Sequence, residues 1–387
     1  MRAFYDVSLS YNVKKLSTFN IKDSNIENSE FVNTFKNISS EFFNFEVVND
    51  ESIQCKRFFL GIFKLKCFDD NNKNILKNDI KVHVFVTDFI NSKYAIINLL
   101  FYNINEKNIS YLLDNAQQNL LLFTDTNELF SNFFEKKYNI KFLTTPKSCV
   151  SFYDENFQEK KLVYFLSHQS IVSNMLDDGI ISPKFINYAN TNLSQYNGCI
   201  INISNCSVVQ RLVNNIVDKL EDRLTYMILT IFMIELLELK ECYLLDLRND
   251  LLNHKINEKL SINNTVELNS KLLQINKLWN INFFIYPITQ TMFELLEDRF
   301  MLKKMKKEYV ELENSFERLI SITETIQNEK NSSLLNNILF IIAFIQICPI
   351  IFEIFLFNFN KFSILYLLSS ISCFIILFIC EYFINKK

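Results

Sequence analysis

The stretch "IIAFIQICPIIFEIFLFNFN", residues 341–360, decides the fold expected for this chain. It is apolar enough to cross a bilayer, yet it contains Gln346, Pro349 and Glu353. A carboxylate and a proline are unusual inside a transmembrane helix because the bilayer core offers no water to solvate the charge or the freed carbonyl group. These residues therefore need an explanation within a membrane helix.

Two apolar runs lie near the C-terminus, Ile338–Phe357 and Ile364–Ile384. Each has about the 20 residues that a transmembrane helix needs to cross a hydrocarbon core about 30 Å thick. The outer loop between them, residues 358–363, is too short for more than a turn. The sequence therefore predicts a two-helix transmembrane hairpin within residues 335–387.

Lysine placement predicts the orientation of this hairpin. Lys330 precedes the first run and Lys386 and Lys387 follow the second, whereas the loop has only Lys361. The positive-inside rule then puts both termini in the cytoplasm. We expect a multi-pass protein of the inner (cytoplasmic) membrane.

The polar residues of the first run fall on one helical stripe. Glu353 needs a partner or water, because a charge at the centre of a bilayer costs at least about 2.5–3.5 kcal/mol. An oligomer with a central water-accessible axis would supply that water, so we interpret the stripe as a candidate pore lining. Its residues, at alternating steps of three and four, are Asn336, Leu339, Ala343, Gln346, Ile350, Glu353, Phe357 and Asn360.

Other interpretations of this stripe stay open. Glu353 could be protonated and bonded to serines of the second run (Ser369, Ser370 or Ser372), or it could lie at the outer interface of a shallow helix. Gln346 fits either a polar ring in a pore or a hydrogen bond between helices. Pro349 bends the helix, which could set the pore diameter or be a neutral kink.

Upstream of the apolar runs, residues 287–334 are expected to form one continuous stalk helix. Apolar residues repeat every seven positions there, with charged residues between them. We expect this stalk to self-associate, the alternative being an amphipathic helix that packs on its own domain. The two rows are Leu295, Leu302, Tyr309 and Phe316, and Met305, Leu312, Leu319 and Ile326.

The rest of the chain, residues 1–286, is expected to form a cytosolic domain in two parts. Residues 1–206 are expected to be α/β, with strands in 2–11, 54–67, 79–90, 94–102, 161–166 and 198–204 and a helix near 109–122. Residues 207–286 are expected to be helical from about Ser207. Their apolar centre, Tyr226–Ile234, predicts a buried helix rather than a third span, because Arg223 and Glu235 limit its length.

Composition argues against several function classes. The net charge is −3 and the charges are interspersed, so direct nucleic-acid binding is not expected. The three glycines form neither a Rossmann nor a P-loop motif, and the nine cysteines form no CxxC pair. The three histidines lack a metal-binding spacing, and His83 is expected on the exposed face of a strand. We expect no enzyme activity, and Asp177 and Asp178 form only a weak candidate for a regulatory metal site.

The layout resembles the CorA-type magnesium channels. Pro349 in "CPIIFEIFLFNFN" stands at the family's proline position, and Asn358, Phe359 and Asn360 stand where its Gly-Met-Asn signature would lie. The glycine and methionine are absent here, and only the asparagine is kept. The resemblance implies a homopentamer with an α/β cytosolic domain, a long helical stalk and a C-terminal two-helix transmembrane hairpin.

This resemblance implies two functions. The first is an ion channel or transporter for divalent cations such as Mg²⁺, with a cytosolic domain that senses a ligand or an ion. The second is a membrane effector of a prokaryotic antiviral (type III CRISPR-type) system, gated by a small nucleotide messenger. Both imply the lipid bilayer and further copies of the chain as partners, and the sequence assigns no ligand-binding residue.

Overall fold

The computed structural model describes residues 3–17, 21–22, 30–36, 55–68, 79–89, 92–154, 191–196, 199–203, 207–212, 220–257, 270, 273, 284, 287–300 and 302–357. The chain divides into two compact units, Met1–Asn314 and Ser315–Lys387. The sequence had placed its domain boundaries elsewhere, after residues 206, 286 and 334.

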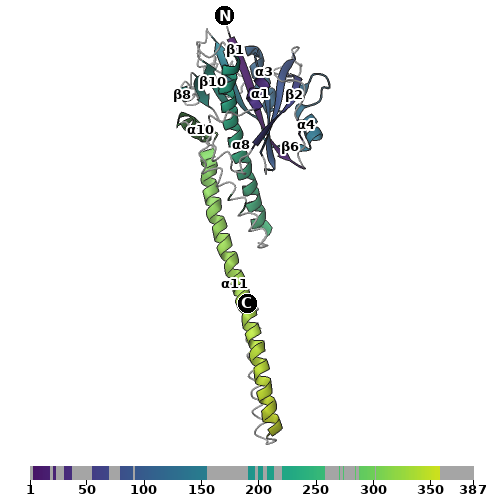
Figure 1. Cartoon of the computed structure of the whole chain (residues 1–387), viewed down its shortest axis with the longest axis vertical. Helices are drawn as coiled ribbons and strands as arrows, with labels where there is room; N and C mark the ends of the chain where they lie inside the picture. The colour runs from purple at the N-terminus through teal and green to yellow at the C-terminus, as the bar shows by residue number, and fades with distance from the viewer. Residues whose placement is uncertain are drawn as a thin grey trace. The chain divides into compact units, whose positions relative to one another are not determined.

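A mixed sheet of ten strands forms the centre of the first unit (Figure 1). Its order is β5-β2-β3-β4-β1-β7-β10-β9-β8, with β6 paired to β1. The pair β7–β10 is parallel and the other pairs are antiparallel. The strands are β1 (Ala3–Lys15), β2 (Cys55–Lys66), β3 (Ile80–Phe89), β4 (Tyr94–Phe101), β5 (Leu122–Phe123), β6 (Ile140–Phe142), β7 (Lys147–Asp154), β8 (Thr191–Tyr196), β9 (Cys199–Ile203) and β10 (Ser207–Leu212).

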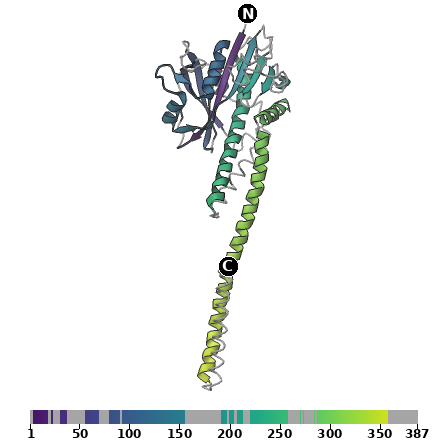
Figure 2. The same cartoon turned by 180° about the vertical axis from the view of Figure 1, so that it is seen from behind.

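Helices cover both faces of this sheet, as the opposite views in Figures 1 and 2 show. On one face, a hydrophobic core joins the sheet to α1 (Glu30–Lys36), α8 (Leu220–Asn257) and α10 (Pro287–Arg299). On the other face, a second core joins it to α3 (Glu106–Gln117) and α4 (Phe130–Tyr138). Two covered faces explain why every residue of β4 is buried.

Helix α8 is buried on all sides from Met227 to Lys240. Every residue from Met227 to Lys240 is buried, because the sheet lies on one side and α1 and α10 pack on others. The prediction of a buried helix at Tyr226–Ile234 is thereby confirmed for the described side chains. The predicted helix start near Ser207 is wrong, because Ser207–Leu212 forms β10 and pairs with both β7 and β9.

The predicted fold class is wrong in its C-terminal half. Within the part of the chain that the structure describes, no helix is both long enough and apolar enough to cross a membrane. The predicted transmembrane hairpin is not found, and its second helix, 364–384, lies outside the described residues.

The predicted stalk is also not found as a unit. The chain forms α10, then Phe300 in a turn, and then α11 (Leu302–Phe357), which runs past the predicted end of the stalk at residue 334. Leu302 is 1% exposed and belongs to the core around α8, and Met305 packs against that core. The start of the heptad pattern therefore reflects packing on the chain's own domain, which was the alternative interpretation.

The α/β prediction for the N-terminal part is largely correct in its strands. The strands expected at 2–11, 54–67, 79–90, 94–102 and 198–204 correspond to β1, β2, β3, β4 and β9, and the expected helix corresponds to α3. The segment 161–166 lies outside the described residues. His83 is 6% exposed, so the prediction of a surface histidine is wrong; alternation in β3 suggested one solvated face, but helices cover both.

Candidate functional site

Polar side chains line the sheet face beneath α8, one from each of four neighbouring strands. They are Arg57 on β2, Thr87 on β3, Asn98 on β4 and Ser10 on β1, and all four are buried. Strand pairing brings them together, because Arg57 pairs with Thr87 and Ser10 pairs with Asn98. These four residues form a polar row across the sheet face that α8 covers.

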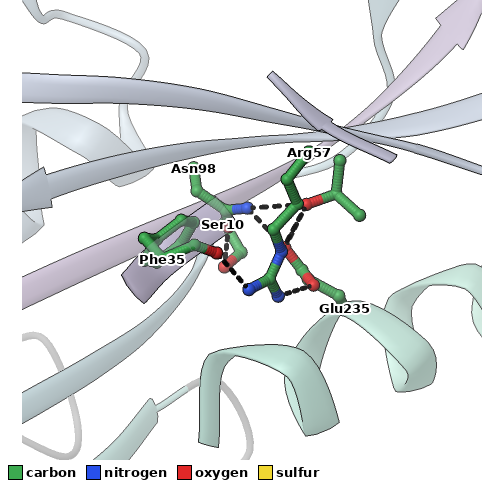
Figure 3. A network of polar contacts seen from close by, with 6 residues as sticks. Ser10, Phe35, Arg57, Asn98 and Glu235 are labelled. Atoms are coloured by element: carbon green, nitrogen blue, oxygen red, sulfur yellow. Dashed lines mark hydrogen bonds and ion pairs between the residues drawn. The ribbon is translucent and has the colours of Figure 1, made fainter. Parts of the chain in front are cut away.

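Glu235 of α8 is the shared partner of this row (Figure 3). Its Oε2 lies 2.5 Å from Arg57 Nη2. Its Oε1 accepts hydrogen bonds from Thr87 Oγ1 at 2.6 Å and from Asn98 Nδ2 at 2.5 Å. Asn98 Oδ1 in turn accepts from Ser10 Oγ at 2.8 Å, so the network extends from β2 to β1.

Arg57 is held on every side. Its Nη1 donates to the Phe35 carbonyl oxygen at 3.0 Å and its Nε donates to Thr87 Oγ1 at 3.2 Å. The guanidinium also lies over the rings of Phe35 and Phe232, 4.7 and 5.6 Å from their centroids. This planar group thus ties α1, the sheet and α8 together.

The network around Glu235 is suited to positioning rather than to reaction chemistry. The Glu235 carboxylate and the Arg57 guanidinium have no exposed side-chain surface, and both carboxylate oxygens accept hydrogen bonds. A buried ion pair with satisfied hydrogen bonds contributes little net stability over an apolar pair, but it penalises alternative packing strongly. The network joins α8 to β2, β3 and β4 and to α1 through direct polar contacts.

A second charged cluster lies further along α8. Lys147, at the start of β7, contacts Glu241 in a salt bridge and lies 3.8 Å from Glu238 Oε1. Glu238 has no exposed surface, and its carboxylate faces the backbone amide and the ammonium of Lys147. Burial raises the pKa of Glu238 to about 8, against the lowering effect of Lys147, and the negative charges of Glu241 and Glu235 raise it further.

The other titratable groups of the first unit offer no activated nucleophile among the described residues. Burial raises the pKa of the Cys55 and Cys67 thiols to about 12, so both stay protonated. Burial, together with the charge of Lys81, lowers the pKa of His83 to about 4, so its imidazole is neutral near pH 7. Tyr102 Oη contacts the His83 ring.

No metal centre is apparent in the described ranges. Among those residues, no group of three or more histidine, cysteine, aspartate or glutamate side chains is arranged to hold a metal ion. Asp177 and Asp178 lie outside them, so the weak prediction of a regulatory metal site there stays a prediction.

The structure places most of the predicted pore-lining stripe on α11. Asn336, Leu339 and Ala343 have exposed side chains there, and α11 continues through Pro349 to Phe357. The outer-loop residues Asn358, Phe359 and Asn360 lie outside the described residues. The helix thus carries the stripe's residues from 336 to 357, and their role in a pore stays a prediction.

Sequence reasoning missed both charged clusters in the first unit. Glu235 was noticed only as the end of an apolar run, although a carboxylate inside such a run is itself a signal for a buried partner. Asn98 in "YAIINLLF" and Arg57 in "CKRFFLGIF" are similar signals. Their pairing could not be read from the sequence, because Arg57 and Glu235 are 178 positions apart.

Comparisons with known proteins add no relative to this picture. The chain matches no protein-family model, no curated protein and no solved structure. The resemblance to CorA-type channels therefore stays a prediction from the sequence layout.

Proposed function

We propose that the protein is a membrane effector, with a non-enzymatic α/β unit that senses a ligand and a C-terminal helix that acts on lipid. The observation that carries this proposal is a group of large apolar side chains exposed on α11. The exposed fractions are 60% for Leu334, 60% for Leu335, 53% for Ile338, 54% for Leu339, 57% for Ile341 and 44% for Ile342.

The spacing of these residues places them on one broad face of α11. At 100° per residue they span a little under half of the helix, while Asn336 and Asn337 lie on the other side. Soluble monomers rarely leave a contiguous apolar surface of this kind in water. Burying it releases about 25 cal/mol for each Å².

The surrounding sequence favours lipid as the partner that buries the apolar face of α11. The apolar run continues from this face to Phe357, a second one spans Ile364–Ile384, and Lys330 precedes both. An amphipathic helix beside a longer apolar segment binds strongly to the interface of a bilayer, where the apolar side chains enter the acyl region. This contact does not require that α11 cross the membrane.

Ion conduction is a second candidate, and the continuity of α11 favours it. The helix runs through Gln346 and Glu353 to Phe357, so both polar residues belong to the helix that bears the apolar face. In an assembly of several copies, a ring of Glu353 side chains would attract cations such as Mg²⁺. A ligand or an ion sensed by the α/β unit would gate this channel, whereas a nucleotide messenger is the gating ligand that the effector proposal would take.

Vesicle binding by the full-length protein tests the membrane proposal. We expect the protein to co-sediment with liposomes and the variant L334S/L335S/I338S to bind at least tenfold more weakly, because each serine removes buried apolar area. The matched control is I322S/I326S, which alters residues of the same helix that are 53% and 47% exposed upstream of the apolar face. Equal binding by all three proteins would contradict the proposal.

Ion flux separates the two candidates. If the protein conducts, Glu353→Gln lowers cation flux into the same vesicles without changing co-sedimentation. Binding with no flux supports an effector that perturbs the membrane, and flux that is indifferent to Glu353 rejects the carboxylate ring.

A further inference from the structure

Three carboxylates of α8 face two cations that the described sheet supplies. Glu235, Glu238 and Glu241 follow one another at intervals of three residues, and the first two are fully buried. Arg57 is 2.5 Å from Glu235, and Lys147 contacts Glu241, whose side chain is 23% exposed. Glu238 lies between these two pairs and faces the backbone amide and the ammonium of Lys147.

Lys147 links this unmatched carboxylate to the junction of α10 and α11. Its ammonium lies 3.8 Å from Glu238 Oε1 and 5.6 Å from the centroid of the Phe300 ring. Phe300 immediately follows α10, its amide donates to the Leu296 carbonyl oxygen at 2.9 Å, and α11 begins two residues later at Leu302. Phe300 and Leu302 belong to the same core as α8.

A neighbouring salt bridge ties α8 to α10 without taking part in this competition. Lys240 Nζ lies 2.6 Å from Glu297 Oε1 and 4.8 Å from the Phe293 ring centroid. This contact keeps α10 beside α8, so a change at Lys147 acts mainly on Phe300 and the start of α11.

We propose that Glu238 is a proton-sensitive switch, whose charge state decides how Lys147 is shared and thereby how tightly Phe300 and Leu302 pack on α8. With Glu238 protonated, Lys147 serves Glu241 and its cation–π contact with Phe300. Loss of the proton adds a second fully buried negative charge to that of Glu235, and this charge competes with Glu241 for the Lys147 ammonium and weakens the packing at Phe300. The groups that face Glu238 are Lys147 from β7 and Glu235, Glu241 and Cys242 from α8.

The direction in which pH changes folding stability follows from the coupling between proton binding at Glu238 and folding. Burial, opposed by Lys147, raises the pKa of Glu238 to about 8, from 4.5 in an unperturbed glutamate. Between these values the folded chain holds a proton that the unfolded chain releases, so folding weakens as pH rises. This one group lowers the folding constant by about tenfold for each pH unit in that window. The inference concerns the first unit and holds whether or not the chain binds lipid.

Hydrogen exchange on the full-length protein without lipid tests the switch, with protection factors corrected for the intrinsic pH dependence of exchange. We expect protection of the Phe300 amide, which donates to the Leu296 carbonyl oxygen, to fall by about fiftyfold between pH 6 and 8. The variant E238Q keeps a neutral side chain of the same shape, so its protection should be independent of pH in this range.

Two further variants separate the roles of the neighbouring charges. Lys147→Met removes the cation through which Glu238 acts on Phe300, so protection of the Phe300 amide should lose its pH dependence. Glu241→Gln removes a negative neighbour and frees Lys147, so the transition moves to lower pH. Identical pH profiles at Phe300 for the wild type and E238Q would overturn the proposal, and so would a pH-dependent global stability with constant protection at Phe300.

Discussion

At the scale of single residues, the buried salt bridge between Glu235 and Arg57 matters most for stability, because removing one partner leaves the other charge buried and unpaired. It accepts hydrogen bonds from two uncharged side chains and pairs with Arg57 where neither charged group reaches solvent. Glu235→Ala would leave the guanidinium buried without a counter-charge. We expect this variant to lose about 3–5 kcal/mol in the free energy of unfolding, measured by chemical denaturation.

Two comparisons make this prediction specific. The double variant R57M/E235L removes both charges together, so it should recover most of the loss. The surface pair Lys136–Glu128 is the control, with side-chain exposures of 76% and 30%, and Lys136→Ala should cost at most about 1 kcal/mol. If Glu235→Ala loses no more unfolding free energy than Lys136→Ala, then water reaches Arg57 and solvates its charge.

At the scale of elements, the start of α11 belongs to the α/β unit, whereas its later turns do not bury their apolar residues. Leu302 is 1% exposed and packs in the core with α8 and α10, but Ile326, in the companion heptad row, is 47% exposed. We expect Leu302→Ala to lower the free energy of unfolding of the first unit by about 2–5 kcal/mol. Ile326→Ala, the matched control on the same helix, should change it by no more than about 0.5 kcal/mol. Thermal or chemical unfolding followed by near-UV circular dichroism checks both, and equal effects would contradict the assignment of Leu302 to this core.

The elements that were predictable from sequence are those whose pattern is local. The strands β1 to β4 are rich in β-branched and aromatic residues between polar turns, which identifies them without knowledge of their partners. Strand β10 was assigned to a helix because "SVVQRLVNNIVDKL" has helical periodicity, and pairing with β7 and β9 outweighs that preference.

The charged clusters could not be predicted because they depend on strand order. Lys147 meets Glu241 only because α8 packs against β7, and Arg57 meets Glu235 only because α8 crosses the same face of the sheet. His83 shows the same limit, since a polar residue between valines indicates a solvated face only where no helix covers it. The C-terminal hairpin was inferred from hydropathy and a resemblance alone, and no tertiary contact entered that prediction.

At the scale of the whole molecule, the two units differ in how their helices are stabilised. In the first unit, α8 lies inside a hydrophobic core. Two salt bridges, Arg57–Glu235 and Lys147–Glu241, join it to the sheet. In the second, most described side chains of α11 from residue 321 to residue 343 are exposed, so packing contributes little to that part of the helix. Among the described residues, those of the first unit are therefore held by core packing and charge pairs, whereas those of α11 in the second unit leave apolar side chains exposed.

This division predicts a pattern of hydrogen exchange across the chain. We expect amides in the Met227–Leu239 segment of α8 to exchange only through global unfolding, whereas amides at 321–343 of α11 exchange through local opening, at least about a hundredfold faster. Adding liposomes should slow exchange in the segment Leu334–Ile342, because burial of its apolar face stabilises the helix there, and should leave α8 unchanged. The variant L334S/L335S/I338S provides the control and should show no slowing. Mass spectrometry of peptic fragments measures all three segments in one experiment, and slowing that appears in α8 but not at Leu334–Ile342 would place the lipid contact in the first unit instead.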